Sequence, residues 1–140
     1  MALLFANNNS LSAITTKPSG LSGGSMNLIS TQTASSSSTI SFTSGIDSTY
    51  DEYVFMILDN ANDSGGNGEL RLFSPSSTTF VKHFIITGTG FVVDGGNPKN
   101  YNMYVAGYGN TTSAIDAVQF SMAGGTIDSG KIKLYGIKDS

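Results

Sequence analysis

Residues able to transfer protons are scarce in this chain. Its 140 residues include one histidine, His83, and no cysteine. His83 stands between Lys82 and Phe84 in an apolar segment, where the alternation of a strand would place it on the polar face. One histidine with scattered carboxylates forms neither a catalytic triad nor a histidine-based metal site. We therefore expect a structural role for His83.

The carboxylates offer one further catalytic alternative. Asp47, Asp51, Glu52 and Asp116 could supply the acid and base pair of a glycoside hydrolase. The chain has no tryptophan to form a sugar-stacking platform, although its six tyrosines could stack on a ligand. Asp51 and Glu52 directly precede an apolar run and are better explained as polar residues at the start of a strand. We expect that the protein is not an enzyme.

A second group of carboxylates invites a calcium interpretation. The sequence DNANDSGGNGE starts at Asp59 and combines acidic residues, asparagine and glycine. With Asn60 as the first position of a helix-flanked calcium loop, the twelfth position is Arg71, where a bidentate glutamate is required. An irregular site formed by Asp59, Asp63 and Glu69 stays open as an alternative. A solvated turn is the favoured interpretation, and we expect no metal site.

Glycines at Gly88 and Gly90 suggest the beginning of a dinucleotide-binding fingerprint. Val93 stands where the third glycine would fall, and no helical pattern follows that could receive a phosphate. We interpret Gly88, Thr89 and Gly90 as a turn and expect no cofactor.

The overall composition excludes several classes of partner. Charged residues make up 12% of the chain, about half the usual fraction, and the formal net charge is −3. A basic nucleic-acid footprint is therefore absent. No apolar segment is long enough to span a bilayer, and the N-terminus lacks the basic region of a signal peptide. We expect no nucleic acid and no membrane among the partners.

Alternation of apolar and polar residues predicts an all-β fold. Turn-forming residues separate eight or nine apolar segments, and no segment has a helical period. Ile40 and Phe42 share one face of their strand, whereas the run YVFMIL is apolar throughout and is typical of a strand covered on both faces. We predict a single β-sandwich or jelly-roll domain. The expected strands are 26–35, 38–44, 53–58, 69–73, 80–87, 91–94, 101–108, 115–122 and 131–138.

The first 25 residues differ from the rest. They are rich in Gly, Ser and Asn, and their apolar side chains are concentrated at Leu3, Leu4, Phe5 and Leu21. We predict an extended N-terminal arm over residues 1–25 and a β-sandwich over residues 26–140. Ordering such a segment costs roughly 1–2 kcal/mol per residue, so a neighbouring subunit is the simplest partner that could hold it. The four apolar residues are the expected anchors.

Two long segments resemble a known family. MNLISTQTASSSSTISFTSGIDSTYDEYVF (26–55) and AIDAVQFSMAGGTIDSGKIKLYGIK (114–138) are similar to small virion proteins of tailed bacteriophages, in particular phages of cyanobacteria and marine bacteria. They cover 55 of the 140 residues. Members of that family have a longer central region, often with tryptophan, whereas this chain has a compact segment 59–110 without it. The resemblance is therefore weakest in this central segment.

The resemblance implies a virion structural protein with a β-sandwich or jelly-roll body and no catalytic activity. The leading hypothesis is a capsid cement or decoration protein on the outer surface of the capsid. Its partners would be the major capsid protein and further copies of itself, with a homotrimer favoured. The loop containing Asp47, Tyr50 and Asp51 is a second, weaker candidate for a contact between subunits.

The alternative hypothesis is the head domain of a tail fibre or spike that binds a receptor on the host cell. Exposed tyrosines at Tyr101, Tyr104 and Tyr108 would then contact glycans. A fibre usually has a repetitive shaft, and this chain contains no repeat. The capsid protein is therefore the preferred interpretation.

Overall fold

All regular elements in the described part of the chain are β-strands. The structure, a computed structural model, describes residues 25–58 and 65–138. None of these residues belongs to a helix that could cross a membrane. The predicted all-β class is confirmed. The strands are β1 (Met26–Ser37), β2 (Thr39–Phe42), β3 (Glu52–Leu58), β4 (Gly65–Phe73), β5 (Lys82–Asp94), β6 (Asn97–Gly109), β7 (Val118–Ser121) and β8 (Ile127–Ile137).

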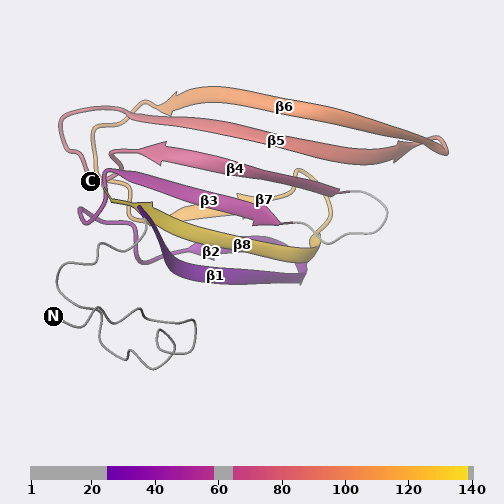
Figure 1. Cartoon of the computed structure of the whole chain (residues 1–140), viewed down its shortest axis with the longest axis horizontal. Coiled ribbons are helices and arrows are strands. Elements are labelled where there is room, and N and C mark those ends of the chain that lie inside the picture. The colour runs from indigo at the N-terminus through magenta and orange to yellow at the C-terminus, as the bar shows by residue number, and fades with distance from the viewer. Residues whose placement is uncertain (1–24, 59–64, 139–140) are drawn as a thin grey trace, which may run out of the picture.

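The strands form two layers of very different width (Figure 1). Six of them make one antiparallel sheet in the order β1-β8-β3-β4-β5-β6, and β2 pairs with β7 in a second sheet. All eight lie within residues 26–140, the range predicted for the body. The arm predicted over residues 1–25 lies outside the described residues, apart from Ser25, whose carbonyl accepts a hydrogen bond from the Lys138 amide at 2.9 Å.

An aromatic cluster joins the two layers. Phe42 of β2 meets Phe55 of β3 edge to face, with ring centroids 5.2 Å apart. Phe120 of β7 packs on both rings, at 6.2 Å from Phe42 and 5.4 Å from Phe55. Such pairs contribute about 0.5–1.5 kcal/mol beyond the burial of their area. Around them lie Ala34, Ile40, Ile46, Tyr53, Ile132 and Leu134, all buried.

The small sheet covers only part of the large one. The buried cluster around the aromatic rings draws its large-sheet residues from β1, β8 and β3, with Leu70 of β4 packed against it, and Leu72 of β4 is buried outside this cluster. No residue of β5 or β6 belongs to this cluster. In Figure 1, β5 and β6 run along one side of the sheet, and the turn that joins them projects beyond the other strands. We call β5 and β6, residues 82–109, the outer hairpin.

The turn predicted at Gly88, Thr89 and Gly90 is wrong, because all three lie inside β5. Gly88 faces Gly68 of β4, and Gly90 faces Gly66. A Cβ atom on Gly88 would lie 2.8 Å from the Asn67 carbonyl oxygen, a distance that real Cβ atoms do not show. These glycines permit a close approach between strands rather than a change of direction. For the same reason β4 begins at Gly65, four residues before its predicted start.

A further boundary difference concerns a buried lysine, and the strands predicted at 80–87 and 91–94 form the single strand β5. The strand predicted to start at Phe80 starts at Lys82, whose side chain is buried. Its Nζ donates hydrogen bonds to the carbonyl oxygens of Ser77 at 2.6 Å and Phe80 at 2.7 Å. The chain before β5 therefore wraps around the ammonium group. Hydrogen bonds to charged groups are worth about 1.5–3 kcal/mol, so Lys82 fixes the start of the outer hairpin.

The core placement leads to a stability prediction. Replacing Phe42 by Ala should lower the free energy of unfolding by about 3–5 kcal/mol, because it leaves a cavity beside Phe55 and Phe120. Urea unfolding followed by circular dichroism measures this loss. The matched control is Phe80→Ala, at a side chain that is 68% exposed, with an expected change within about 0.5 kcal/mol. Equal losses in both variants would contradict a core built on β2.

Candidate functional site

The outer hairpin exposes side chains that do not contribute to the buried core, and it is therefore the first candidate for a functional surface. Its two strands pair without interruption from Lys82↔Gly109 to Asp94↔Asn97. Gly95 and Gly96 form the connecting turn with φ of 58° and 82°, values that glycine adopts without strain. Positive φ at both residues is the signature of the type I′ turn that joins two-residue hairpins.

Both faces of the outer hairpin expose large apolar side chains. The core-side face is the one that β2 and β7 cover elsewhere, and the opposite one is called the outer face. On the core-side face the exposed fractions are 37% for Val92, 50% for Tyr101, 42% for Met103 and 40% for Val105. On the outer face Phe91, Val93, Tyr104 and Tyr108 are exposed. Large exposed apolar side chains gathered in one hairpin in this way indicate a candidate site of interaction.

The three tyrosines proposed to bind a glycan do not form one site. All are exposed, but successive side chains of a strand point to opposite faces. Tyr104 and Tyr108 therefore share the outer face, while Tyr101 lies on the core-side face. There the Tyr101 ring covers Gly90, whose missing side chain leaves the room it needs.

His83 lies on the outer face and is exposed. Its ring contacts Tyr108 with centroids 6.0 Å apart and an angle of 42° between the planes. Within residues 25–58 and 65–138 no carboxylate is hydrogen-bonded to it. His83 is thus a neighbour of an exposed tyrosine rather than part of an acid–base pair.

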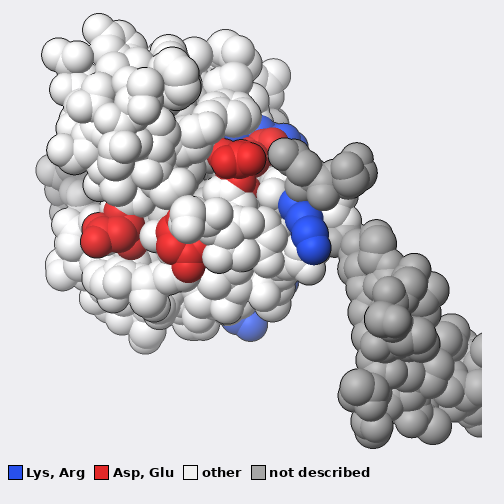
Figure 2. Space-filling model, turned by 90° about the vertical axis from the view of Figure 1, so that its left-hand side faces the viewer, with Lys and Arg blue, Asp and Glu red and all other residues white. Residues whose placement is uncertain are grey.

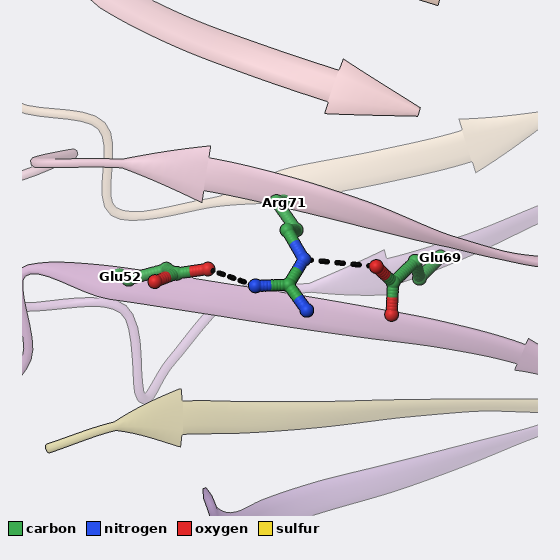
Figure 3. A network of polar contacts seen from close by, with 3 residues as sticks. All are labelled: Glu52, Glu69 and Arg71. Carbon is green, nitrogen blue, oxygen red and sulfur yellow. Dashed lines mark hydrogen bonds and ion pairs between the residues drawn. The ribbon is translucent and has the colours of Figure 1, made fainter. Parts of the chain in front are cut away.

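Two of the candidate carboxylates are engaged with a single arginine. Arg71 donates to Glu52 at 2.7 Å and to Glu69 at 2.8 Å, across the outer face of β3 and β4 (Figure 3). The hydrogen bond to Glu69 raises the pKa of Arg71 above its ordinary value, with Glu52 adding to it. Because these pairs are partly exposed, they contribute only about 0–1 kcal/mol each. Both glutamates of β3 and β4 are thereby held by one guanidinium, and neither is an isolated acidic group.

No metal centre is formed by the described residues. They contain no group of three or more His, Asp or Glu side chains able to surround an ion. Of the irregular calcium site, Glu69 is paired with Arg71, whereas Asp59 and Asp63 lie outside the described residues. Charged side chains are few and separated at the end of the molecule shown in Figure 2, where Asp and Glu are red and Lys and Arg blue.

The loop before β3 is held by the buried Tyr53. The Tyr53 hydroxyl accepts a hydrogen bond from the Asp47 amide at 3.0 Å and donates to the Asp47 carbonyl at 2.9 Å. Burial raises the pKa of the Tyr53 phenol. Hydrogen bonds from Thr49 lower the pKa of the Asp47 carboxyl, which accepts from the Thr49 amide at 2.8 Å. Asp47 therefore has a local structural role.

Tyr50 and Asp51 are also part of the scaffold. The Tyr50 ring packs at a right angle to Tyr53, with centroids 5.7 Å apart, and covers Gly136 of β8. The Asp51 carbonyl accepts a hydrogen bond from the Ser74 amide at 2.6 Å. A contact of this loop with another subunit stays a prediction. The four arm anchors Leu3, Leu4, Phe5 and Leu21 lie outside the described residues.

An open hollow of about 360 Å³ lies near the free end of the outer hairpin. Its lining is mainly amide, hydroxyl and glycine, with two aromatic rings, so it offers hydrogen bonds but no pair of acidic side chains. The residues that line it are Gly65, Asn67, Thr89, Gly90, Phe91, Asn100, Tyr101 and Asn102.

Comparisons with protein-family models, with curated proteins and with solved structures found no match to this chain.

The Tyr53 contacts lead to a prediction about pH. A phenol whose pKa is raised on folding stabilises the folded state fully below its ordinary pKa of about 10, and this contribution is lost as the pH rises through the folded value. Tyr53→Phe should lower the free energy of unfolding by about 1 kcal/mol at pH 7 and weaken its decline above pH 10. Urea unfolding at pH 7 and pH 11 measures both effects. The control Tyr104→Phe should retain the full decline, and an unchanged decline in Tyr53→Phe would contradict this role.

Proposed function

We propose that this chain is a non-enzymatic structural protein of a bacteriophage virion, a decoration protein bound to the outer surface of the capsid. The observation that carries the proposal is the outer hairpin, whose apolar side chains are exposed on both faces. A chain that works alone in solution gains nothing from such a surface, whereas a subunit of an assembly covers it with a neighbour. The major capsid protein is the proposed partner.

The distribution of the family resemblance supports this interpretation. The similar segments 26–55 and 114–138 contain β1, β2, β7, β8 and the first half of β3, the strands that build the covered core. The dissimilar segment 59–110 contains β4, β5 and β6, the uncovered part of the sheet. A shared scaffold therefore carries a surface particular to this chain, as expected of related subunits that fit different shells.

The surface chemistry is also suited to a large contact area. With 12% charged residues the chain has few groups whose removal from water is costly. Along β1, exposed Thr31, Thr33 and Ser35 can exchange hydrogen bonds with water or a neighbour. Because such a protein binds the assembled shell and not its separate subunits, it stabilises the shell by mass action.

A receptor-binding head of a tail fibre or spike is the second candidate. The observation that favours it is the pair of tyrosines on the outer face, Tyr104 and Tyr108, which are 71% and 59% exposed. Aromatic rings with polar tips are suited to stacking on sugars. The number of copies on the particle separates this candidate from the first.

Copy number provides the first test of the proposed function. On purified virions the molar ratio of this chain to the major capsid protein, measured by quantitative mass spectrometry with labelled peptides, should be between about one third and one, since a decoration protein occupies sites repeated over the shell. The portal and tail proteins of the same particles provide the control for a low-copy component. A ratio close to theirs would contradict the capsid position and favour the receptor-binding head.

The arm provides a second test of the proposed function. Deleting residues 2–12 removes Leu3, Leu4 and Phe5 but none of the eight strands, so the β-domain should fold with an unchanged circular dichroism spectrum. Binding to shells stripped of the protein should weaken at least tenfold, as measured by co-sedimentation. The matched control replaces residues 6–10, which contain no anchor, by a Gly/Ser sequence of equal length. Full binding by the deletion variant would remove the anchor hypothesis.

A further inference from the structure

We propose that two copies of this chain associate through the free edges of their β6 strands, antiparallel around a two-fold axis at Tyr104. The two six-stranded sheets would then form one continuous sheet. The proposal concerns how the chain binds itself, and it does not depend on whether the chain decorates a capsid.

The turn geometry defines which backbone groups of β6 face outward. In a two-residue hairpin the pair next to the turn, Asp94↔Asn97, exchanges both of its hydrogen bonds. Hydrogen-bonded and non-hydrogen-bonded pairs then alternate along the strands. Residues 98, 100, 102, 104, 106 and 108 therefore direct their N–H and C=O groups away from β5. Residue 98 is proline, which has no N–H to leave unpaired at such a position.

Two residues that discourage strand pairing, Pro98 and Lys99, lie next to the turn, whereas the section of β6 from Asn100 to Gly109 has no charge, no proline and no bulge. The whole strand is 13 residues long, pairs with β5 without a bulge, and carries one charged side chain, that of Lys99. Short length, bulges and several charges are the common protections of an edge. The other edge strand, β1, does have a bulge, between Leu28 and Ser30, and its middle section bears polar side chains. Of the two edge strands, β6 is thus the one better suited to pair with a further strand.

The sequence of β6 is complementary to itself in one antiparallel register. With Tyr104 on the two-fold axis, all outward-facing groups from Asn100 to Tyr108 find partners, which gives about ten backbone hydrogen bonds. Lys99 lies opposite Gly109, so no like charges meet. In this register two tyrosines form an aromatic pair at the axis, a kind of cross-strand pair that stabilises antiparallel sheets. The outer-face pairs are Tyr104–Tyr104, Asn102–Ala106 and Asn100–Tyr108, and the core-side pairs are Met103–Val105 and Tyr101–Gly107.

Shifting the register loses this match. An axis at Asn102 pairs Ala106 with Pro98, which cannot donate. An axis at Ala106 places Asn100 and Asn102 opposite residues beyond the end of β6, so about six backbone hydrogen bonds form instead of about ten. The register on Tyr104 also joins the core-side side chains Met103 and Val105 of the two copies, which are 42% and 40% exposed in the single chain. A second copy in the register on Tyr104 therefore pairs all outward-facing backbone groups from Asn100 to Tyr108 and brings no like charges together.

A cysteine at the axis tests the register, and the chain has no cysteine of its own to interfere. In Tyr104→Cys the two Cα atoms would be about 5.5 Å apart, within the range of a disulfide. Mild oxidation of the purified full-length chain should produce covalent dimers. The matched control Tyr108→Cys, on the same strand and face, places its two cysteines roughly 27 Å apart and should stay monomeric on a denaturing gel. A mixture of Asn100→Cys and Tyr108→Cys should crosslink.

Charges at the axis test the same geometry without covalent bonds. Tyr104→Lys and Tyr104→Glu each place two like charges opposite one another, and each should weaken dimerisation about tenfold in analytical ultracentrifugation. An equimolar mixture of the two variants should restore it, because lysine then faces glutamate. Circular dichroism confirms that both variants are folded, as expected for a side chain that is 71% exposed.

Several outcomes would overturn the proposal. These are a wild-type chain that is monomeric at 100 µM, a trimer, equal crosslinking of Tyr104→Cys and Tyr108→Cys, or a mixture of the charge variants that does not re-associate. Loss of the dimer on deletion of residues 2–12 would also overturn it, because the arm of a neighbouring copy, and not its β6 strand, would then be the partner of this edge. A dimer with these properties on a protein absent from the capsid would support the proposal while removing the proposed function.

Discussion

A two-stranded sheet cannot cover a six-stranded one, and this constraint determines most of what the molecule presents to its surroundings. Strands in a sheet lie about 4.7–4.9 Å apart, so β2 and β7 protect about two strand widths of the larger layer. Beneath them Phe42, Phe55 and Phe120 exclude water and provide the cooperative core. Beyond them the sheet continues into β5 and β6, where Phe84, Ile85 and Ile86 are half-buried and most of the other large apolar side chains are exposed.

The covered part of the fold could be predicted from the sequence because its signals are local. Alternation at Ile40 and Phe42 indicated a strand with one buried face, and both side chains are buried. The continuous run from Tyr53 indicated a strand covered on both faces, and Val54 is buried on the side away from β2 and β7. The uneven division of the strands between the layers was not predictable, because it depends on which strands pair.

The errors in the uncovered part have separate physical causes. A glycine is compatible both with a turn and with close strands, and only the residue opposite decides between them. Gly88 faces Gly68, a partner twenty residues away in sequence, so the local pattern indicated a turn where the strand continues. The face on which each tyrosine lies depends on the alternation of side chains along the strand. Alternation separates Tyr101 from Tyr104, but the strand had to be located before that separation could be used. The burial of Lys82 could not be predicted from the sequence, because the carbonyl oxygens that bind its ammonium group come from a loop.

The division between the two halves of the sheet also separates two kinds of mutational effect. Substitutions around Phe55 act on folding, because they remove contacts that the whole core shares. Substitutions at Tyr104 or Val105 leave that core intact, because neither side chain belongs to it. Lys82 fixes the start of the outer hairpin through carbonyl oxygens that do not depend on the side chains of their residues. Exposed side chains of the hairpin can therefore be replaced without removing contacts from the buried core, so the residues that stabilise the fold are separate from those at its uncovered edge.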